Sequence, residues 1–197
     1  FVHGGYWLRF GRRDFSHLAQ GACLLDWAVA MPSYPLAPEA SIPEITQSVA
    51  MAITEAASRI AGPIVLAGHS AGGHLVARMG QDDVGLPSAV RERIQKIVPI
   101  SPVADLLPLM QTEMNVTLKL TKASAKAESP AYRPRPNDTD VHIWVGAKER
   151  PVFLEQAKLL ATNWQAGLTI EVSKHHFDII AGLEDPDSSL MAALLED

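Results

Sequence analysis

A serine between two glycines is the residue of this chain whose setting most directly indicates chemistry. Residues 68–72 read Gly-His-Ser-Ala-Gly; an apolar run at 64–67 precedes them, and a helical pattern beginning near Gly73 follows. A sharp strand-to-helix turn of this kind lifts the Ser70 hydroxyl above the edge of a sheet, and glycines let neighbouring backbone approach closely. The sequence therefore predicts that Ser70 is a nucleophile in acyl transfer, the alternative being a glycine-rich turn with a capping serine.

A His-Gly-Gly run near the start of the chain could bind the negative charge that acyl transfer creates. An oxyanion needs two or more preorganised donors. After a nucleophile turn, one donor is the amide of the next residue, here Ala71, and another comes from an earlier loop. We expect Gly4 and Gly5 to supply the second donor, with the amide of Tyr6 as an alternative.

A serine hydroxyl is a weak nucleophile and needs a base to take its proton. Seven histidines are present, and His175 and His176 directly follow the strand expected at 168–172. In the fold that this turn suggests, the chain order is serine, acid, histidine, and the base lies on the loop after the last strand. Either of the two histidines satisfies this position.

The acid that orients the base should follow the strand expected at 141–145, where Glu149 stands. Asp105, after the strand expected at 96–100, is the competing candidate. The alternative interpretation of Glu149 is a surface carboxylate ahead of a helix that opens at Pro151.

The elements that must position these residues alternate between short apolar runs and helical runs, which is typical of a parallel sheet with crossover helices. We expect strands at 1–2, 23–31, 64–67, 96–100, 141–145 and 168–172. We expect helices at 16–20, 43–59, 74–79, 151–165 and 188–195, the last capped by Asp187. The sequence thus predicts an α/β-hydrolase fold: a mostly parallel twisted sheet with helices on both faces.

One domain is expected over 1–197, with an insertion at about 105–140 whose weak periodicity suggests one or two short helices. A long excursion between two strands is often functional, so we interpret it as a cap over a pocket, with a plain surface insertion as the alternative. The first two residues, Phe1-Val2, read as the end of a buried strand, and we therefore expect N-terminal strands to be missing from this sequence.

Several runs together resemble arylformamidases, also called kynurenine formamidases, which are α/β-hydrolases. They are HGGYW at 3–7, YPLAP at 34–38, GHSAGGHL at 68–75, SPVADL at 101–106, VGAKERPVF at 145–153 and HFDI at 176–179. The similarity spans essentially the whole chain. The HGG run and YPLAPE at 34–39 are also similar to the hormone-sensitive-lipase group of carboxylesterases.

This resemblance implies hydrolysis of the N-formyl group of formylkynurenine, without a metal or an organic cofactor. It implies a triad of Ser70, Glu149 and His176, which favours His176 over His175. Glutamate stands here where the family has aspartate. Tyr6 and Trp7 follow the oxyanion loop, so we expect them to line the substrate pocket, packing in the core being the alternative.

Composition narrows the classes of function. The chain has 197 residues, 47% of them hydrophobic and 20% charged, with a net charge of −5 and no lysine or arginine cluster, so nucleic acid is not an expected partner. No apolar run is long enough to cross a membrane. Cys23 is the only cysteine, which fits a cytoplasmic location. No metal-binding or phosphate-binding motif occurs.

From these features we predict a serine hydrolase that cleaves a small carboxylic ester or amide through an acyl-enzyme. Its partner is then a small-molecule substrate, and a homodimer is a further expectation. A dedicated kynurenine formamidase is the first alternative, and a non-catalytic hydrolase fold used for binding is the second.

Overall fold

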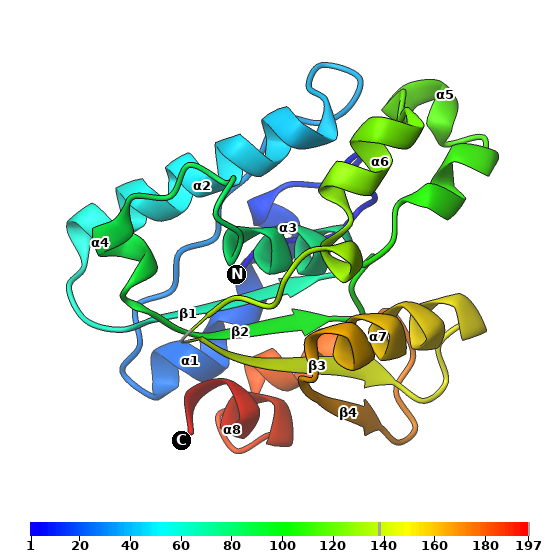
Figure 1. Cartoon of the computed structure of the whole chain (residues 1–197). Helices are drawn as coiled ribbons and strands as arrows, with labels where there is room; N and C mark the ends of the chain where they lie inside the picture. The colour runs from blue at the N-terminus through cyan, green and yellow to red at the C-terminus, as the bar shows by residue number, and fades with distance from the viewer. Residues whose placement is uncertain (138, 197) are drawn as a thin grey trace.

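A parallel four-stranded sheet forms the centre of the computed structural model, which describes residues 1–137 and 139–196. Its strands lie in the order β1 (Ile64–His69), β2 (Ile94–Ile100), β3 (Asp140–Gly146) and β4 (Gly167–Glu171). Each strand pairs in parallel with the next along the chain, so all four carboxyl ends lie at one edge of the sheet (Figure 1). The loops that leave this edge carry the residues singled out in the sequence.

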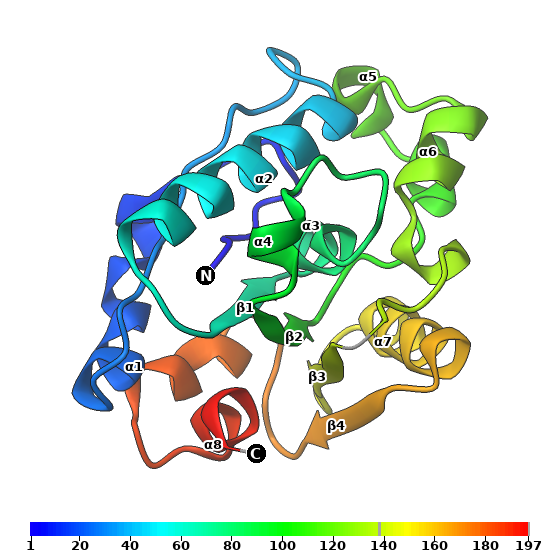
Figure 2. The same cartoon turned by 60° about the vertical axis from the view of Figure 1, so that its left-hand side comes forward.

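Helices cover both faces of the sheet (Figures 1 and 2). One face carries α2 (Ile42–Arg59), α3 (Ala71–Met79) and α7 (Pro151–Trp164), which pack against a buried cluster containing sheet residues of alternate positions. The other face carries α1 (Gln20–Leu24), the 3-10 segment η4 (Ile179–Glu184) and α8 (Ser189–Leu195). A parallel sheet must bury both of its faces, and the predicted α/β-hydrolase architecture is confirmed.

Shorter elements complete the chain. The 3-10 helix η1 (Arg12–Ala19) runs directly into α1, and α4 (Ser88–Arg91) lies between α3 and β2. The helix α2 starts where its sequence signals predict, because the Glu44 carboxylate accepts hydrogen bonds from the amide and hydroxyl of Ser41 and Pro43 occupies the first turn.

Two expectations about local structure are wrong. No strand forms at 23–31: α1 takes the first residues and 25–31 is irregular. A strand needs a neighbour to accept its hydrogen bonds, and this segment joins no strand of the described sheet. At the strand expected over Phe1-Val2, an isolated bridge joins Val2 to Gly68. In α8 the cap is Ser188, whose hydroxyl accepts the amide hydrogen of Met191, and not Asp187.

The expected insertion contains four short helical elements in its described part. They are η2 (Leu107–Gln111), α5 (Asn115–Leu118), α6 (Lys122–Glu128) and η3 (Pro130–Tyr132). Figure 1 shows α5 and α6 on the same side of the sheet as α2 and α3. The buried apolar side chains of the insertion belong to the core on that face of the sheet (Leu106, Leu109, Leu118, Leu120 and Ala125). The segment is therefore built into the domain, and its role as a cap stays a prediction.

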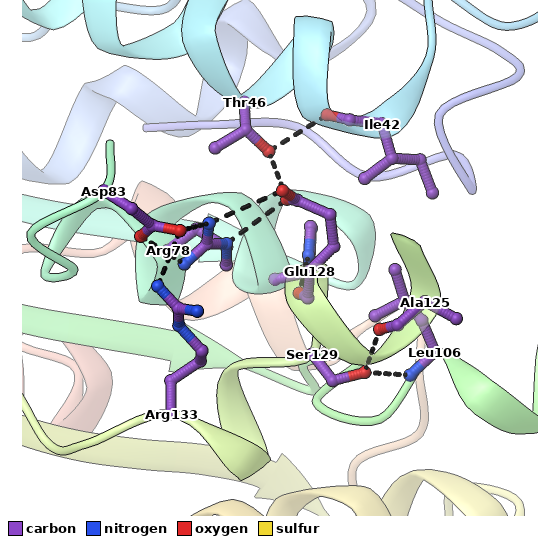
Figure 3. Close-up of polar contacts among 10 residues, drawn as sticks. Ile42, Thr46, Arg78, Asp83, Leu106, Ala125, Glu128, Ser129 and Arg133 are labelled. Atoms are coloured by element: carbon purple, nitrogen blue, oxygen red, sulfur yellow. Dashed lines mark hydrogen bonds and ion pairs between the residues drawn. The ribbon is translucent and has the colours of Figure 1, made fainter. Parts of the chain in front are cut away.

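A buried ion cluster ties this segment to α2 and α3 (Figure 3). The Arg78 guanidinium lies 3.2 Å from the carboxylate of Glu128 and 3.0 Å from that of Asp83. Thr46 donates a hydrogen bond of 2.9 Å to Glu128, and Arg133 lies 2.6 Å from Asp83. Because Glu128 is buried and Arg78 is its ion-pair partner, removing Arg78 would leave an uncompensated buried charge, at a cost of about 3–5 kcal/mol.

Candidate active site

Ser70 lies at a sharp turn between β1 and α3, with φ of 56° and ψ of −115°. A non-glycine residue at positive φ stores about 1–3 kcal/mol of strain. The Ser70 amide donates to the carbonyl of Ile100 at 2.9 Å, and the Ser70 carbonyl accepts the amide hydrogen of His74 at 3.0 Å. A Cβ on Gly72 would lie 1.9 Å from the Val2 carbonyl oxygen, so this glycine lets the turn pack against the first residues of the chain.

Three side chains from three loops form one hydrogen-bonded chain. The Oγ of Ser70 lies 3.1 Å from Nε2 of His176, and Nδ1 of His176 lies 2.6 Å from Oε2 of Glu149. A carboxylate can only accept, so Nδ1 carries the proton and Nε2 is free to accept from the serine hydroxyl. The structure thus brings together the three residues that the family resemblance implies as a triad.

The Glu149 carboxylate is fully buried and has a hydrogen bond from each side. Its Oε1 accepts from the Ser101 hydroxyl at 2.5 Å and from the Gly146 amide at 2.9 Å, while Oε2 accepts from His176. Burial alone would raise the pKa of the Glu149 carboxyl, but these hydrogen bonds outweigh burial and leave the pKa below its ordinary value. The site therefore holds this group as an anion.

Two aromatic rings hold the His176 imidazole from its sides. Phe153 stacks on it with ring centroids 3.9 Å apart and an interplanar angle of 23°, and His69 lies at 4.6 Å. Burial, followed by the neighbouring His176, lowers the pKa of His69 to about 3, so His69 stays neutral. The His69 side chain thus lies against His176 in this site. Nothing in the spacing of Phe153 distinguished it from an ordinary core residue of α7.

The glycines of the His-Gly-Gly run lie against the nucleophile turn. A Cβ on Gly4 would lie 3.0 Å from the Ser70 Cβ, and Gly5 has a φ of 111°. Within the described residues the amides of Gly4 and Gly5 donate no hydrogen bond. Ala71, as the first residue of α3, has no helical acceptor for its amide either. The Tyr34 hydroxyl donates to the His3 carbonyl at 2.9 Å and so fixes this loop.

Trp7 does not line an open pocket. Its residue exposure is 0%, and its indole meets His74 edge-on at 5.1 Å within the core. The expectation of a substrate-lining Trp7 is therefore wrong, because this side chain packs in the core of the domain. Tyr6 is half-buried, and burial raises the pKa of its hydroxyl. Its place in a substrate pocket stays a prediction.

The competing residues lie elsewhere. The Asp105 carboxylate accepts from the Leu107 amide and from the Tyr132 hydroxyl, each at 2.9 Å, and has no contact with a histidine among the described residues. His175 is exposed, and its Nδ1 lies 3.3 Å from Asp178. Geometry therefore separates Glu149 from Asp105 and His176 from His175.

The described residues contain neither a cluster of metal ligands nor a membrane-spanning helix. Over 1–137 and 139–196, no three His, Cys, Asp or Glu side chains come together as a metal site would require. No helix in these ranges is long and apolar enough to cross a membrane.

The fold is that of an α/β hydrolase. Residues 1–166 match a family described by the alpha/beta hydrolase fold, and the chain belongs to this family.

Particular relatives lie close to this chain. It is 28% identical over 211 residues to the kynurenine formamidase of Salmo salar, covering 100% of this chain and 71% of the relative. A crystal structure from Silicibacter sp. TM1040, provisionally described as a thioesterase, is 54% identical with a TM-score of 0.96, covering 98% and 74% of the two chains. An esterase of Pyrobaculum calidifontis shares the fold, at 19% identity and a TM-score of 0.68 over 93% and 74%. The predicted resemblance to formamidases and esterases is confirmed, and the family and these names indicate a hydrolase.

Proposed function

We propose that this chain is a serine hydrolase that cleaves a small carboxylic ester or amide through an acyl-enzyme on Ser70. The observation that carries the proposal is the hydrogen-bonded chain from Ser70 Oγ through His176 to the buried carboxylate of Glu149. Nucleophile, base and orienting acid are the three parts that this chemistry requires. We also propose a cytoplasmic location, which the exposed free thiol of Cys23 supports.

In the proposed reaction His176 Nε2 takes the proton of Ser70 as Oγ attacks the acyl carbonyl. The amide of Ala71 and those of Gly4 and Gly5 receive the oxyanion, and Glu149 stabilises the imidazolium. His176 then gives its proton to the departing alcohol or amine. Water, deprotonated by the same histidine, attacks the acyl-enzyme and releases the acid with Ser70 restored.

N-formylkynurenine is the second candidate, as the substrate of a dedicated formamidase. The named relatives from Salmo salar and Danio rerio, each 28% identical, favour it. The name given to the protein from Silicibacter sp. TM1040 adds thioesters to the leaving groups worth testing. All three substrate classes use the same nucleophile, base and oxyanion donors, and they differ in the leaving group.

The first experiment is a fluorophosphonate labelling assay with the Ser70→Ala variant as control. Labelling of the native protein and its loss in S70A support a serine hydrolase, whereas an unlabelled native protein would leave the non-catalytic fold as the better interpretation. Turnover in S70A should fall on the order of a million-fold, and near-normal turnover would refute the role of Ser70.

Substrate choice is tested with specificity constants for N-formylkynurenine, p-nitrophenyl acetate and an acetyl thioester. A preference of about a hundred-fold for formylkynurenine corresponds to about 2.7 kcal/mol of transition-state discrimination and would establish the formamidase. Turnover of the activated ester alone would identify a general esterase.

A further inference from the structure

Ser101 is a buried serine outside the expected triad whose hydroxyl faces the triad acid. It is the first residue after β2, and its exposure is 0%. Its Oγ lies 2.5 Å from Oε1 of Glu149. Since an ionised carboxylate only accepts, the serine hydroxyl is the donor in this contact.

The backbone of Ser101, which makes this contact, is strained. Its φ is 48°, in the left-handed region that side chains other than glycine rarely adopt. Its amide donates to the carbonyl of Trp144 in β3 at 2.7 Å, which pins it beside the strand that leads to Glu149. Strain of about 1–3 kcal/mol persists where the surrounding structure fixes it, and such positions cluster at functional sites.

The two oxygens of Glu149 have separate partners. Ser101 and the Gly146 amide bind Oε1, and His176 binds Oε2. A glutamate has one more rotatable bond than an aspartate, so its carboxylate has more ways to turn away from the imidazole. A donor on Oε1 removes that freedom and leaves Oε2 as the acceptor for His176.

We propose that Ser101 is a positioning residue: its hydroxyl anchors the Glu149 carboxylate so that Oε2 meets Nδ1 of His176. This inference rests on the proposed function of the Ser70 site. Sequence reasoning missed it because a serine after a strand is common, and only the strand order shows that this one lies beside the acid loop.

The first test measures kcat and KM for p-nitrophenyl acetate in Ser101→Ala and Ser101→Gly. Both remove the hydroxyl, and S101G also relieves the positive φ. We expect both to lower kcat by about 10- to 100-fold and to change KM by less than about 3-fold, since one charge-assisted hydrogen bond is lost. Unchanged kcat in S101G would show that the hydroxyl does nothing and would overturn the proposal.

A double-mutant cycle separates positioning from a general structural role. If Ser101 acts through Glu149, adding S101A to Glu149→Ala should change kcat by less than about 2-fold. A further loss of 10-fold or more in that background would overturn the proposal. The matched control is Ser129→Ala: Ser129 is equally buried, but its hydroxyl donates to the Ala125 carbonyl, and not to Glu149, and accepts from the Leu106 amide (Figure 3). S129A should keep kcat within about 2-fold and lower only the thermal midpoint.

Failure of this inference is distinguishable from failure of the proposed function. If the native protein is not labelled by fluorophosphonate at Ser70, the hydrolase itself is refuted. If the native protein is labelled and active while S101A matches it in kcat, the hydrolase stands and the role of Ser101 is refuted.

Discussion

Replacing Glu149 by glutamine keeps the shape of the side chain and removes its charge. The oxygen of the new amide must face Ser101 and the Gly146 amide, because both are donors to this position. The NH2 group then meets Nδ1 of His176, where a carboxylate now accepts at 2.6 Å. Two donors cannot pair, so the imidazole is driven to the tautomer that places a hydrogen on Nε2, facing Ser70. That tautomer cannot take the serine proton.

The lost charge also costs energy when the imidazolium forms. Two unit charges about 4 Å apart interact by about 4 kcal/mol at an effective dielectric constant of about 20. At about 1.4 kcal/mol per factor of ten, this is about a thousand-fold in kcat. Loss of the correct tautomer in another serine triad costs about ten thousand-fold. We therefore expect E149Q to lower kcat by about 1,000- to 10,000-fold.

The assay is hydrolysis of p-nitrophenyl acetate, with thermal unfolding to show that the variant is folded. Glu149→Asp is the matched variant, because it keeps the charge and shortens the side chain by about 1.5 Å. The kcat of E149D should lie between those of the native protein and E149Q, since the shorter side chain must lengthen its hydrogen bonds either to His176 or to Ser101 and Gly146. A folded E149Q with kcat within about 10-fold of the native value would refute this reasoning.

Three further changes probe the rest of the site and the core. Phe153→Leu removes the ring stacked on His176, and cation–π stabilisation of about 0.5–2 kcal/mol predicts a kcat about 2- to 30-fold lower, with Phe153→Tyr close to native in the same ester assay. Gly4→Ala would place a Cβ 3.0 Å from that of Ser70, and displacing one oxyanion donor should cost about 100- to 1,000-fold in kcat; an active variant would place the oxyanion elsewhere. Burial lowers the pKa of His74 from 6.5 to about 4. As the pH falls, the unfolded chain therefore binds this proton before the folded chain does. The free energy of unfolding then falls by about 1.4 kcal/mol per pH unit between about pH 6.5 and 4. Urea unfolding at pH 7, 6 and 5 should therefore show a shallower pH dependence for His74→Gln, and an unchanged slope would contradict the burial argument.

Sequence reasoning reached the nucleophile turn because its signal is local. The strand at 64–67, the glycines and the following helix lie within one short segment, and β1 and α3 form around it. The chain order of serine, acid and histidine was equally informative, since it predicts the acid on the loop after β3 and the base on the loop after β4. Glu149 and His176 follow from that order together with the family resemblance.

The residues that contact His176 and Glu149 could not be predicted from local sequence. Phe153, His69 and Ser101 are ordinary in type, and their meaning depends on which loops of the sheet become neighbours. Trp7 was misplaced because its position after the His-Gly-Gly run does not show whether its side chain faces a pocket or the core. The strand expected at 23–31 is absent for a related reason. Its apolar content favours a strand, but a strand forms only where a neighbouring strand pairs with it.

The span of the triad along the chain has a consequence for folding. Ser70 and His176 are 106 positions apart, and Glu149 is 27 from His176 and 48 from Ser101. Contacts of such long sequence separation form late, because loop closure must precede them. A chain emerging from the ribosome as far as β3 holds the nucleophile turn with neither base nor acid. We therefore expect recovered hydrolysis to lag behind recovered secondary structure in refolding, which makes turnover a reporter for the last step of assembly.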